Sequence, residues 1–266
     1  MKIIKLLKKN EFIFFVLKNT QRIIKKIFQG LFIFTGIDER ISKIERSLVY
    51  EYSSQNFQWE KNCLNGQKFR KKIITEILSK INFTNIVETG TEYGFTTKYF
   101  SQFCKKIITI EKSKPIYLIA KKNLSNDTNI KLVLNDSKNL DKILSDENIK
   151  FKDDENTFFY LDAHSDDDYP LQDEIKYIIE NYKNFILLID DFQVPEDDGY
   201  GYDSYRGKKL NIDFIKNLIS NKKYTFFPSV KSNEETGRTR GYIIITNNYD
   251  FKNILQNIKE LKEHPI

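Results

Sequence analysis

The stretch IVETGTEYGFTT, residues 86–97, decides the fold. An apolar run that ends in an acid is followed by two glycines and a helix-like segment, which is the pattern of a strand, a tight turn and a helix. Glu88 then lies at the carboxyl edge of a sheet, where open α/β folds bind their ligands. Gly90 and Gly94 let the backbone approach such a ligand, because they lack a Cβ atom.

The spacing of this turn indicates which ligand it binds. Acid-x-Gly-x-x-x-Gly differs from the Gly-x-Gly-x-x-Gly pattern of nicotinamide and flavin binders. An acid in the turn repels a pyrophosphate and favours a cation, a hydroxyl or an amino group. S-adenosylmethionine carries an ammonium beside a sulfonium, so the turn favours this cofactor. The predicted cofactor contacts in this stretch are Glu88, Thr89, Gly90, Gly94 and Thr97.

The rest of the chain alternates between apolar strand-like runs and helix-like stretches. This pattern predicts an α/β fold, a Rossmann-like, seven-stranded and mostly parallel sheet with helices on both faces and an antiparallel last strand. The expected strands are Asn85–Thr89, Lys106–Glu111, Ile130–Leu134, Thr157–Asp162, Phe185–Asp190, Tyr224–Phe227 and Tyr242–Thr246. The expected helices are Gln67–Ile81, Thr96–Phe103, Lys114–Leu124, Lys138–Leu144, Leu171–Asn181, Leu210–Ile219 and Phe251–Leu261.

The positive charge of the chain is concentrated at its start. Residues 1–36 hold eight of the 43 basic side chains and one of the 37 acidic ones, so the remainder is nearly neutral. Basic and apolar residues occupy separate faces of a helix near residues 18–31, which suits either an anionic membrane surface or packing on the body or a second subunit. The longest uncharged stretch, Ile27–Ile37, is 11 residues and too short to span a bilayer. We predict a helical leader and linker at 1–60 and an α/β domain at 61–266.

The two cysteines, Cys63 and Cys104, have neither a disulfide pattern nor a metal-ligand spacing. Two thiols without such a pattern suit a reducing cytoplasm. We therefore expect a cytoplasmic protein, with peripheral contact to the inner membrane face through residues 1–36 as one option. The expected partners are a small-molecule or glycan-precursor substrate and, as an option, a second copy of the chain, without nucleic acid.

Two later strands add polar groups to the predicted cofactor site. Glu111 ends a buried run about 20 residues past the glycines, where an acid can accept both ribose hydroxyls. Asp136 ends the next strand and could accept from an adenine amino group, with Ser137 capping the following helix. The alternative interpretation is that Asp136 is itself the helix cap.

The acids of the fourth and fifth strands predict a site for chemistry. Asp162, Asp190 and Asp191 follow neighbouring strands, and their oxygens suit Mg²⁺ or Mn²⁺. His164 lies two residues after Asp162 on the same side, as a general base for a substrate hydroxyl or as a structural histidine bonded to Asp162.

Two loops near these acids leave alternatives open. The run Asp166–Asp168 is a ligand source or a solvated loop. Residues 195–207, rich in glycine, tyrosine and aspartate, form a substrate lid or a surface turn.

These residues together resemble the class I S-adenosylmethionine-dependent methyltransferases, and more narrowly bacterial divalent-metal-dependent, sugar-type O-methyltransferases. The resemblance covers about residues 67–248. It implies that the turn at Glu88, Gly90 and Gly94 is the cofactor loop, that Glu111 is the ribose acid and that Asp136 lies beside the adenine. It also implies metal ligands at Asp162, Asp190 and Asp191 and a base at His164. The Asp-to-His interval of two departs from the interval of three common in such relatives, and Asp191 stands where they often have Asn.

The sequence therefore predicts an enzyme that methylates a hydroxyl of a sugar, a glycan precursor or another small molecule, with S-adenosylmethionine and a divalent cation. A different class of function is a non-catalytic, cofactor-binding scaffold at a membrane-associated glycan assembly site. A nicotinamide-dependent oxidoreductase shares the sheet and the ribose acid, but the turn spacing disfavours it. The fold alone does not choose among these three functions.

Overall fold

A computed structural model describes residues 58–146, 149, 151, 154–163, 169–219 and 223–265 of the 266-residue chain. The basic leader, His164 and the run Asp166–Asp168 lie outside the described residues. The predicted membrane contact, the division at residue 60 and the role of His164 therefore stay predictions.

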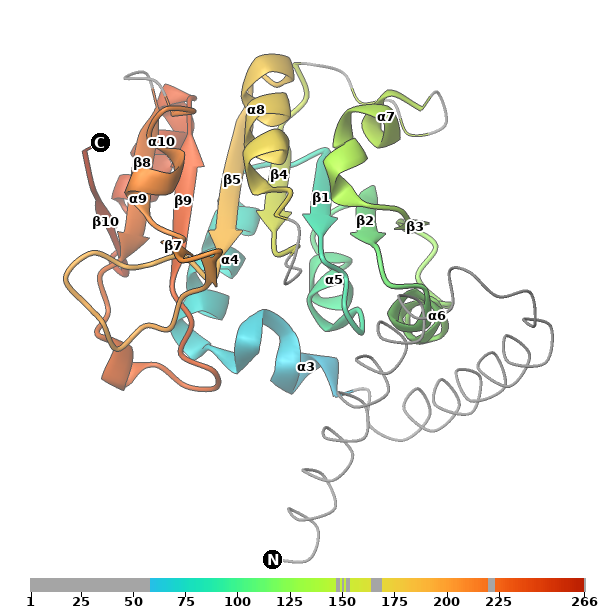
Figure 1. Cartoon of the computed structure of the whole chain (residues 1–266), viewed down its shortest axis with the longest axis horizontal. Coiled ribbons are helices and arrows are strands. Elements are labelled where there is room, and N and C mark those ends of the chain that lie inside the picture. Colours follow the sequence, from blue (N-terminus) through green and yellow to red (C-terminus); the bar gives the residue numbers. More distant parts are fainter. Residues whose placement is uncertain are drawn as a thin grey trace, which may run out of the picture. The chain divides into compact units, whose positions relative to one another are not determined.

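The described chain is built on an eight-stranded sheet in the order β10-β8-β9-β5-β4-β1-β2-β3 (Figure 1). Strands β1 to β5 pair in parallel, and β9 runs antiparallel to both β5 and β8. The predicted Rossmann-like sheet with an antiparallel seventh strand is confirmed, and β10 adds an edge strand antiparallel to β8. The strands are β1 (Asn85–Thr89), β2 (Ile107–Glu111), β3 (Ile130–Leu134), β4 (Thr157–Leu161), β5 (Phe185–Asp190), β8 (Tyr224–Pro228), β9 (Tyr242–Thr246) and β10 (Leu261–Glu263).

Helices cover both faces of this sheet, because successive strand side chains point to opposite sides. Ile186 and Leu188 belong to one apolar cluster, and Leu187 and Ile189 belong to the other. The first cluster packs under α4, α5 and α10, and the second under α7, α8 and α9. The helices are α3 (Trp59–Asn62), α4 (Lys68–Lys80), α5 (Phe95–Phe100), α6 (Lys114–Asn123), α7 (Leu140–Ser145), α8 (Leu171–Asn181), α9 (Ile212–Ile215) and α10 (Tyr249–Gln256), with 3₁₀ turns η1 (Cys63–Gly66), η2 (Ser137–Asn139) and η3 (Ser232–Glu234).

The order of the strands reverses between β1 and β4, and open α/β sheets bind their ligands at such a position. The chain runs outward from β1 through β2 to β3 on one side, and then returns to form β4 and β5 on the other. The segment after β1 leads to β2 on one side, and the segment after β4 leads to β5 on the other side. Neither segment crosses over the carboxyl ends of both β1 and β4. Glu88 in β1 and Asp190 in β5 both approach this edge.

Two segments differ from the sequence-based expectation. The predicted helix Phe251–Leu261 ends at Gln256, and the residues after it turn back so that Leu261–Glu263 pair with β8. The loop at 195–207 contains the first strand of a small hairpin, β6 (Ser204–Tyr205) with β7 (Lys208–Lys209). Within the described residues, no helix is both long and apolar enough to cross a membrane.

Candidate functional site

The glycine turn between β1 and α5 packs directly against the end of β4. Gly90 has φ +83°, and a Cβ atom on it would lie 2.2 Å from the carbonyl oxygen of Asp162. Any other residue would have to push the β4 backbone away, so glycine is required at this position by space as well as by its dihedral angle. Gly94, also at φ +83°, precedes the first residue of α5.

Glu88 is the buried acid of the site. Its side chain is 1% exposed, and one of its oxygens accepts hydrogen bonds from the hydroxyls of Thr97 and, at 2.6 Å, Thr109. Burial raises the pKa of the Glu88 carboxyl to about 7, although these two hydroxyl donors favour the charged form. Thr97 therefore holds Glu88 in place, and its predicted contact with the cofactor stays a prediction.

A small pocket opens at Glu88. Its lining residues come from the segment before α4, from the turn between β1 and α5, and from the end of β4; they are Asn62, Asn65, Glu88, Gly90, Thr91, Glu92, Phe95, Thr96, Tyr160 and Asp162. The enclosed part measures about 40 Å³, far less than the roughly 300 Å³ at which small-molecule pockets begin. It therefore encloses one end of a ligand, and the rest of that ligand would lie along the open edge of the sheet.

The segment before α4 contributes to this pocket and was missed by the sequence analysis. Leu64, Asn65 and Gly66 all have positive φ angles, of 54°, 62° and 68°. Two successive non-glycine residues in the left-handed region cost backbone energy, and such conformations concentrate at functional sites. The Asn65-Gly66 dipeptide is a turn signal that could have indicated this segment.

Glu111, at the end of β2, lies next to the glycine turn. Its carboxylate accepts from the backbone N–H of Ser113 at 2.7 Å and of Glu92 at 3.1 Å. Burial raises the pKa of this carboxyl, and the two N–H groups offset part of the rise. These donors fix the orientation of the carboxylate beside the turn, which fits the predicted contact with ribose hydroxyls.

The other predicted cofactor residues are placed differently. Asp136 caps η2 by accepting from the Lys138 N–H at 3.1 Å, and its other oxygen lies 2.5 Å from the Lys112 ammonium. The capping alternative thus describes Asp136 in this structure, and Ser137 is the first buried residue of η2 rather than its cap. Thr89 is fully buried, and its hydroxyl has no hydrogen-bond partner within the described residues.

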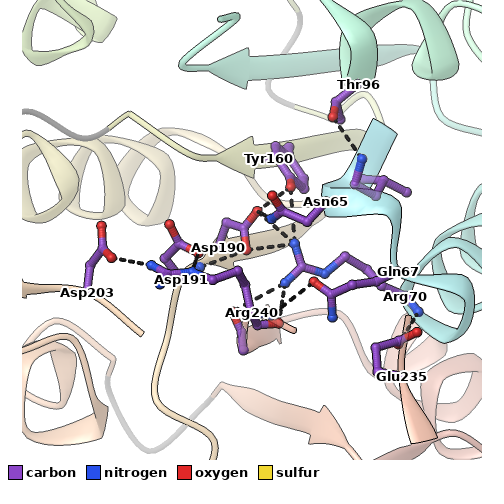
Figure 2. A network of polar contacts seen from close by, with 12 residues as sticks. Asn65, Gln67, Arg70, Thr96, Tyr160, Asp190, Asp191, Asp203, Glu235 and Arg240 are labelled. Carbon is purple, nitrogen blue, oxygen red and sulfur yellow. Dashed lines mark hydrogen bonds and ion pairs between the residues drawn. The ribbon is translucent and has the colours of Figure 1, made fainter. Parts of the chain in front are cut away.

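Two of the three predicted metal ligands, Asp190 and Asp191, are held by arginines (Figure 2). Asp190 is fully buried, and its carboxylate accepts from Arg70 at 2.7 Å, from the Tyr160 hydroxyl at 2.5 Å and from the Asn65 amide at 3.2 Å. Asp191 forms an ion pair with Arg240, which also binds Asp203.

A divalent cation does not fit this donor set. The search of the described residues finds no group of three or more His, Cys, Asp or Glu side chains that could hold a metal ion. The expected metal site at Asp162, Asp190 and Asp191 is thus not supported by the described residues: the Arg70 and Arg240 guanidinium groups supply positive charge to Asp190 and Asp191, and the role of Asp162 stays a prediction. Arg70 was not predicted as a site residue. It lies on the apolar stripe of α4 with Ile73, Ile74 and Ile77, and a charged residue on such a stripe could have indicated a buried ion pair.

Charges in this network are strongly coupled. Burial by itself lowers the pKa of the Arg70 guanidinium, but the Asp190 carboxylate raises it above its usual range. Burial and Asp190 also raise the pKa of Tyr160 well above its ordinary value, so this phenol stays protonated and donates to Asp190.

The loop at 195–207 is tied to the same edge. Asp203 N donates to the Asp191 carbonyl at 2.9 Å, and Tyr200 is 1% exposed with its hydroxyl on the Val230 carbonyl. In this structure the loop forms a fixed wall beside Arg240.

Comparison with known proteins gives likenesses in fold. No family model matches the sequence, and no curated protein does. Among solved structures, an O-methyltransferase from Bacillus cereus in complex with SAH is 18% identical, with 85% of this chain and 96% of that chain covered and a TM-score of 0.46. An rRNA methylase from Streptococcus thermophilus is 13% identical over 65% and 93%, with a TM-score of 0.44. A spermidine synthase from Thermotoga maritima is 10% identical over 73% and 66%, with a TM-score of 0.45. These values carry no argument about activity, which rests on the site itself.

The raised pKa of Glu88 predicts that Glu88→Gln stabilises the protein at high pH. The carboxyl has a pKa of about 7 in the folded chain and about 4.5 in the unfolded chain, so the folded state binds more protons between these values. Stability therefore falls as pH rises from 4.5 to 7. We expect the variant to exceed wild type by about 1–3 kcal/mol at pH 8 and by little at pH 4, measured by urea unfolding. Asp213→Asn, on the surface of α9, should show no such trend, and equal stabilities of Glu88→Gln and wild type at pH 8 would contradict the assignment.

The buried ion pair predicts that Arg70→Met is strongly destabilising. The substitution leaves the Asp190 carboxylate buried without a cation, which costs about 3–5 kcal/mol of unfolding free energy. Equilibrium unfolding at pH 7 measures this loss. The double variant Arg70→Met/Asp190→Asn removes both charges and should recover a large part of it. A single variant within about 1 kcal/mol of wild type would show that the pair does not hold the edge together.

Proposed function

We propose that this chain is an S-adenosylmethionine-dependent methyltransferase that methylates a hydroxyl of a small molecule, such as a sugar or glycan precursor. The observation that carries the proposal is Glu88, a buried carboxylate without a cationic partner among the described residues, at the mouth of a pocket between β1 and β4. A buried acid with a pKa near 7 gains most from a ligand that brings a positive charge.

The pocket's other groups fit the same cofactor. The amide side chains of Asn62 and Asn65 line it opposite the glycine turn, as donors and acceptors for an amino-acid group. Glu111 lies one strand away, with its carboxylate oriented by two backbone N–H groups for a pair of hydroxyls.

The bound cofactor would supply an electrophilic methyl group, and the chain's residues would position it. Glu88 would hold the ammonium end, and Glu111 would fix the ribose. Asp162 lines the same pocket, and His164 beyond it remains the proposed base for the acceptor hydroxyl.

Calorimetric titration with S-adenosylhomocysteine tests the proposal. Wild type should bind with a micromolar Kd and should not bind NAD comparably. Glu88→Gln should weaken binding about 10–100-fold, because it removes the charge opposite the ammonium. Affinity for wild type should increase with pH up to about 7, as Glu88 ionises.

Glu155→Gln is the matched control, since Glu155 bonds Asn85 at the opposite edge of the sheet. It should bind S-adenosylhomocysteine as wild type does. Tight binding of NAD without binding of S-adenosylhomocysteine would reject the proposal. Transfer of a labelled methyl group to nucleotide sugars would then identify the acceptor, and absence of transfer to any hydroxyl compound with intact cofactor binding would favour the scaffold function.

The arginine-held acids predict that methyl transfer needs no added divalent cation. Arg70 and Arg240 already form ion pairs with Asp190 and Asp191, so these two acids are not free to hold a cation that a chelator could remove. We expect the same initial rate of labelled methyl transfer with excess EDTA as with Mg²⁺ or Mn²⁺. Loss of methyl transfer with EDTA and its recovery on adding metal would contradict this prediction and support the metal site.

A further inference from the structure

A second and larger cavity lies beside the proposed cofactor pocket. It measures about 570 Å³, within the roughly 300–1,000 Å³ range of small-molecule sites. Asn65 lines both spaces, so the two are separated by the strained segment before α4. A molecule in the larger cavity would therefore lie next to the pocket of Glu88.

The walls of this cavity combine one acid with two arginines, Asp191, Arg238 and Arg240. The Asp191 carboxylate is already engaged within the wall, because Arg240 forms ion pairs with it and with Asp203. The backbone of the loop is fixed around the same arginine, with Gly201 N on the Thr239 carbonyl at 2.9 Å and Gly241 N on the Gly201 carbonyl at 2.8 Å. The acid is thus unavailable to a cationic ligand.

Arg238 is the second arginine that lines the cavity. Its side chain is exposed, and no described carboxylate lies within ion-pair distance of its guanidinium. Its backbone N–H donates to the Asn65 carbonyl at 2.8 Å, which fixes this residue at the boundary between the two spaces. Its charge also acts on Glu92, a lining residue of the cofactor pocket: desolvation raises the Glu92 pKa and Arg238 offsets part of the rise.

We propose that this cavity is the acceptor site and that Arg238 binds an acidic group of the acceptor, a carboxylate or a phosphate. The proposal rests on the proposed methyltransferase function and names the class of acceptor. A planar guanidinium binds either oxyanion through paired N–H donors. An acidic sugar would thereby be held with its hydroxyls beside the cofactor pocket, whereas a neutral sugar would lack this contact.

The test is a calorimetric titration of the protein saturated with S-adenosylhomocysteine. The probes are D-glucuronate, inorganic phosphate and, as the neutral counterpart, D-glucose. We expect at least one anion to bind at least about tenfold more tightly than glucose, which corresponds to one charge-assisted contact. Phosphate binding above glucuronate would assign a phosphorylated acceptor, and the reverse order a carboxylated one.

Arg238→Gln should remove the preference for the anions and leave the affinity for S-adenosylhomocysteine unchanged. Lys183→Gln, before β5 at the opposite edge of the sheet, removes an equal charge and should keep the preference. Anions that bind no better than glucose, or a preference that survives in Arg238→Gln, would overturn the proposal. Weakened binding of S-adenosylhomocysteine by Arg238→Gln would also overturn it, since Arg238 would then serve the cofactor pocket, either directly or through Glu92.

The same titration separates this proposal from the proposed function. If wild type does not bind S-adenosylhomocysteine, the methyltransferase function fails, and the anion titrations on the protein alone still decide whether Arg238 forms an anion site.

Discussion

The buried pair between Arg70 and Asp190 is the constraint on which the site depends. It joins α4 to the end of β5, and the same arginine donates to the Arg240 carbonyl at 2.7 Å and packs over the Tyr242 ring of β9. The Tyr160 hydroxyl adds β4 to this network, and the Asn65 amide adds the strained turn before α4. Elements distant in sequence are thus fixed around one carboxylate, and both proposed ligand spaces are bounded by residues that this network holds.

The two buried acids at this edge, Asp190 and Glu88, have different partners. Asp190 has an internal cation and three further donors, the Tyr160 hydroxyl, the Asn65 amide and the Asp191 N–H. Glu88 has two threonine hydroxyls and, within the described chain, no cation. A buried carboxylate without a cation is unfavourable in the absence of a ligand, and such groups are typical of binding and catalytic sites. Asp190 therefore stabilises the fold, whereas Glu88 is the acid proposed to bind a ligand.

Local sequence patterns were sufficient to predict the fold and the position of the glycine turn. The alternation of strands and helices predicted the sheet, and the turn at Glu88, Gly90 and Gly94 lies where the spacing placed it. The sequence could not show that Arg70 is the partner of Asp190, because the two residues are 120 positions apart and their contact exists only after folding. Three acids at strand ends indicate a need for positive charge, but the sequence does not say whether a metal or an arginine provides it. Thr97 illustrates the same limit, since its position near the turn was predicted and its bond to Glu88 was not.

The protonation of Glu88 also links ligand binding to the surrounding buffer. Near neutral pH a substantial fraction of this carboxyl carries a proton, because its pKa is about 7. A cation that settles against it favours the ionised form and so expels that proton to solvent. The heat of binding then depends on the ionisation enthalpy of the buffer. The protein exchanges one positive charge for another, and the net charge of the buried site changes by less than the charge of the ligand it receives.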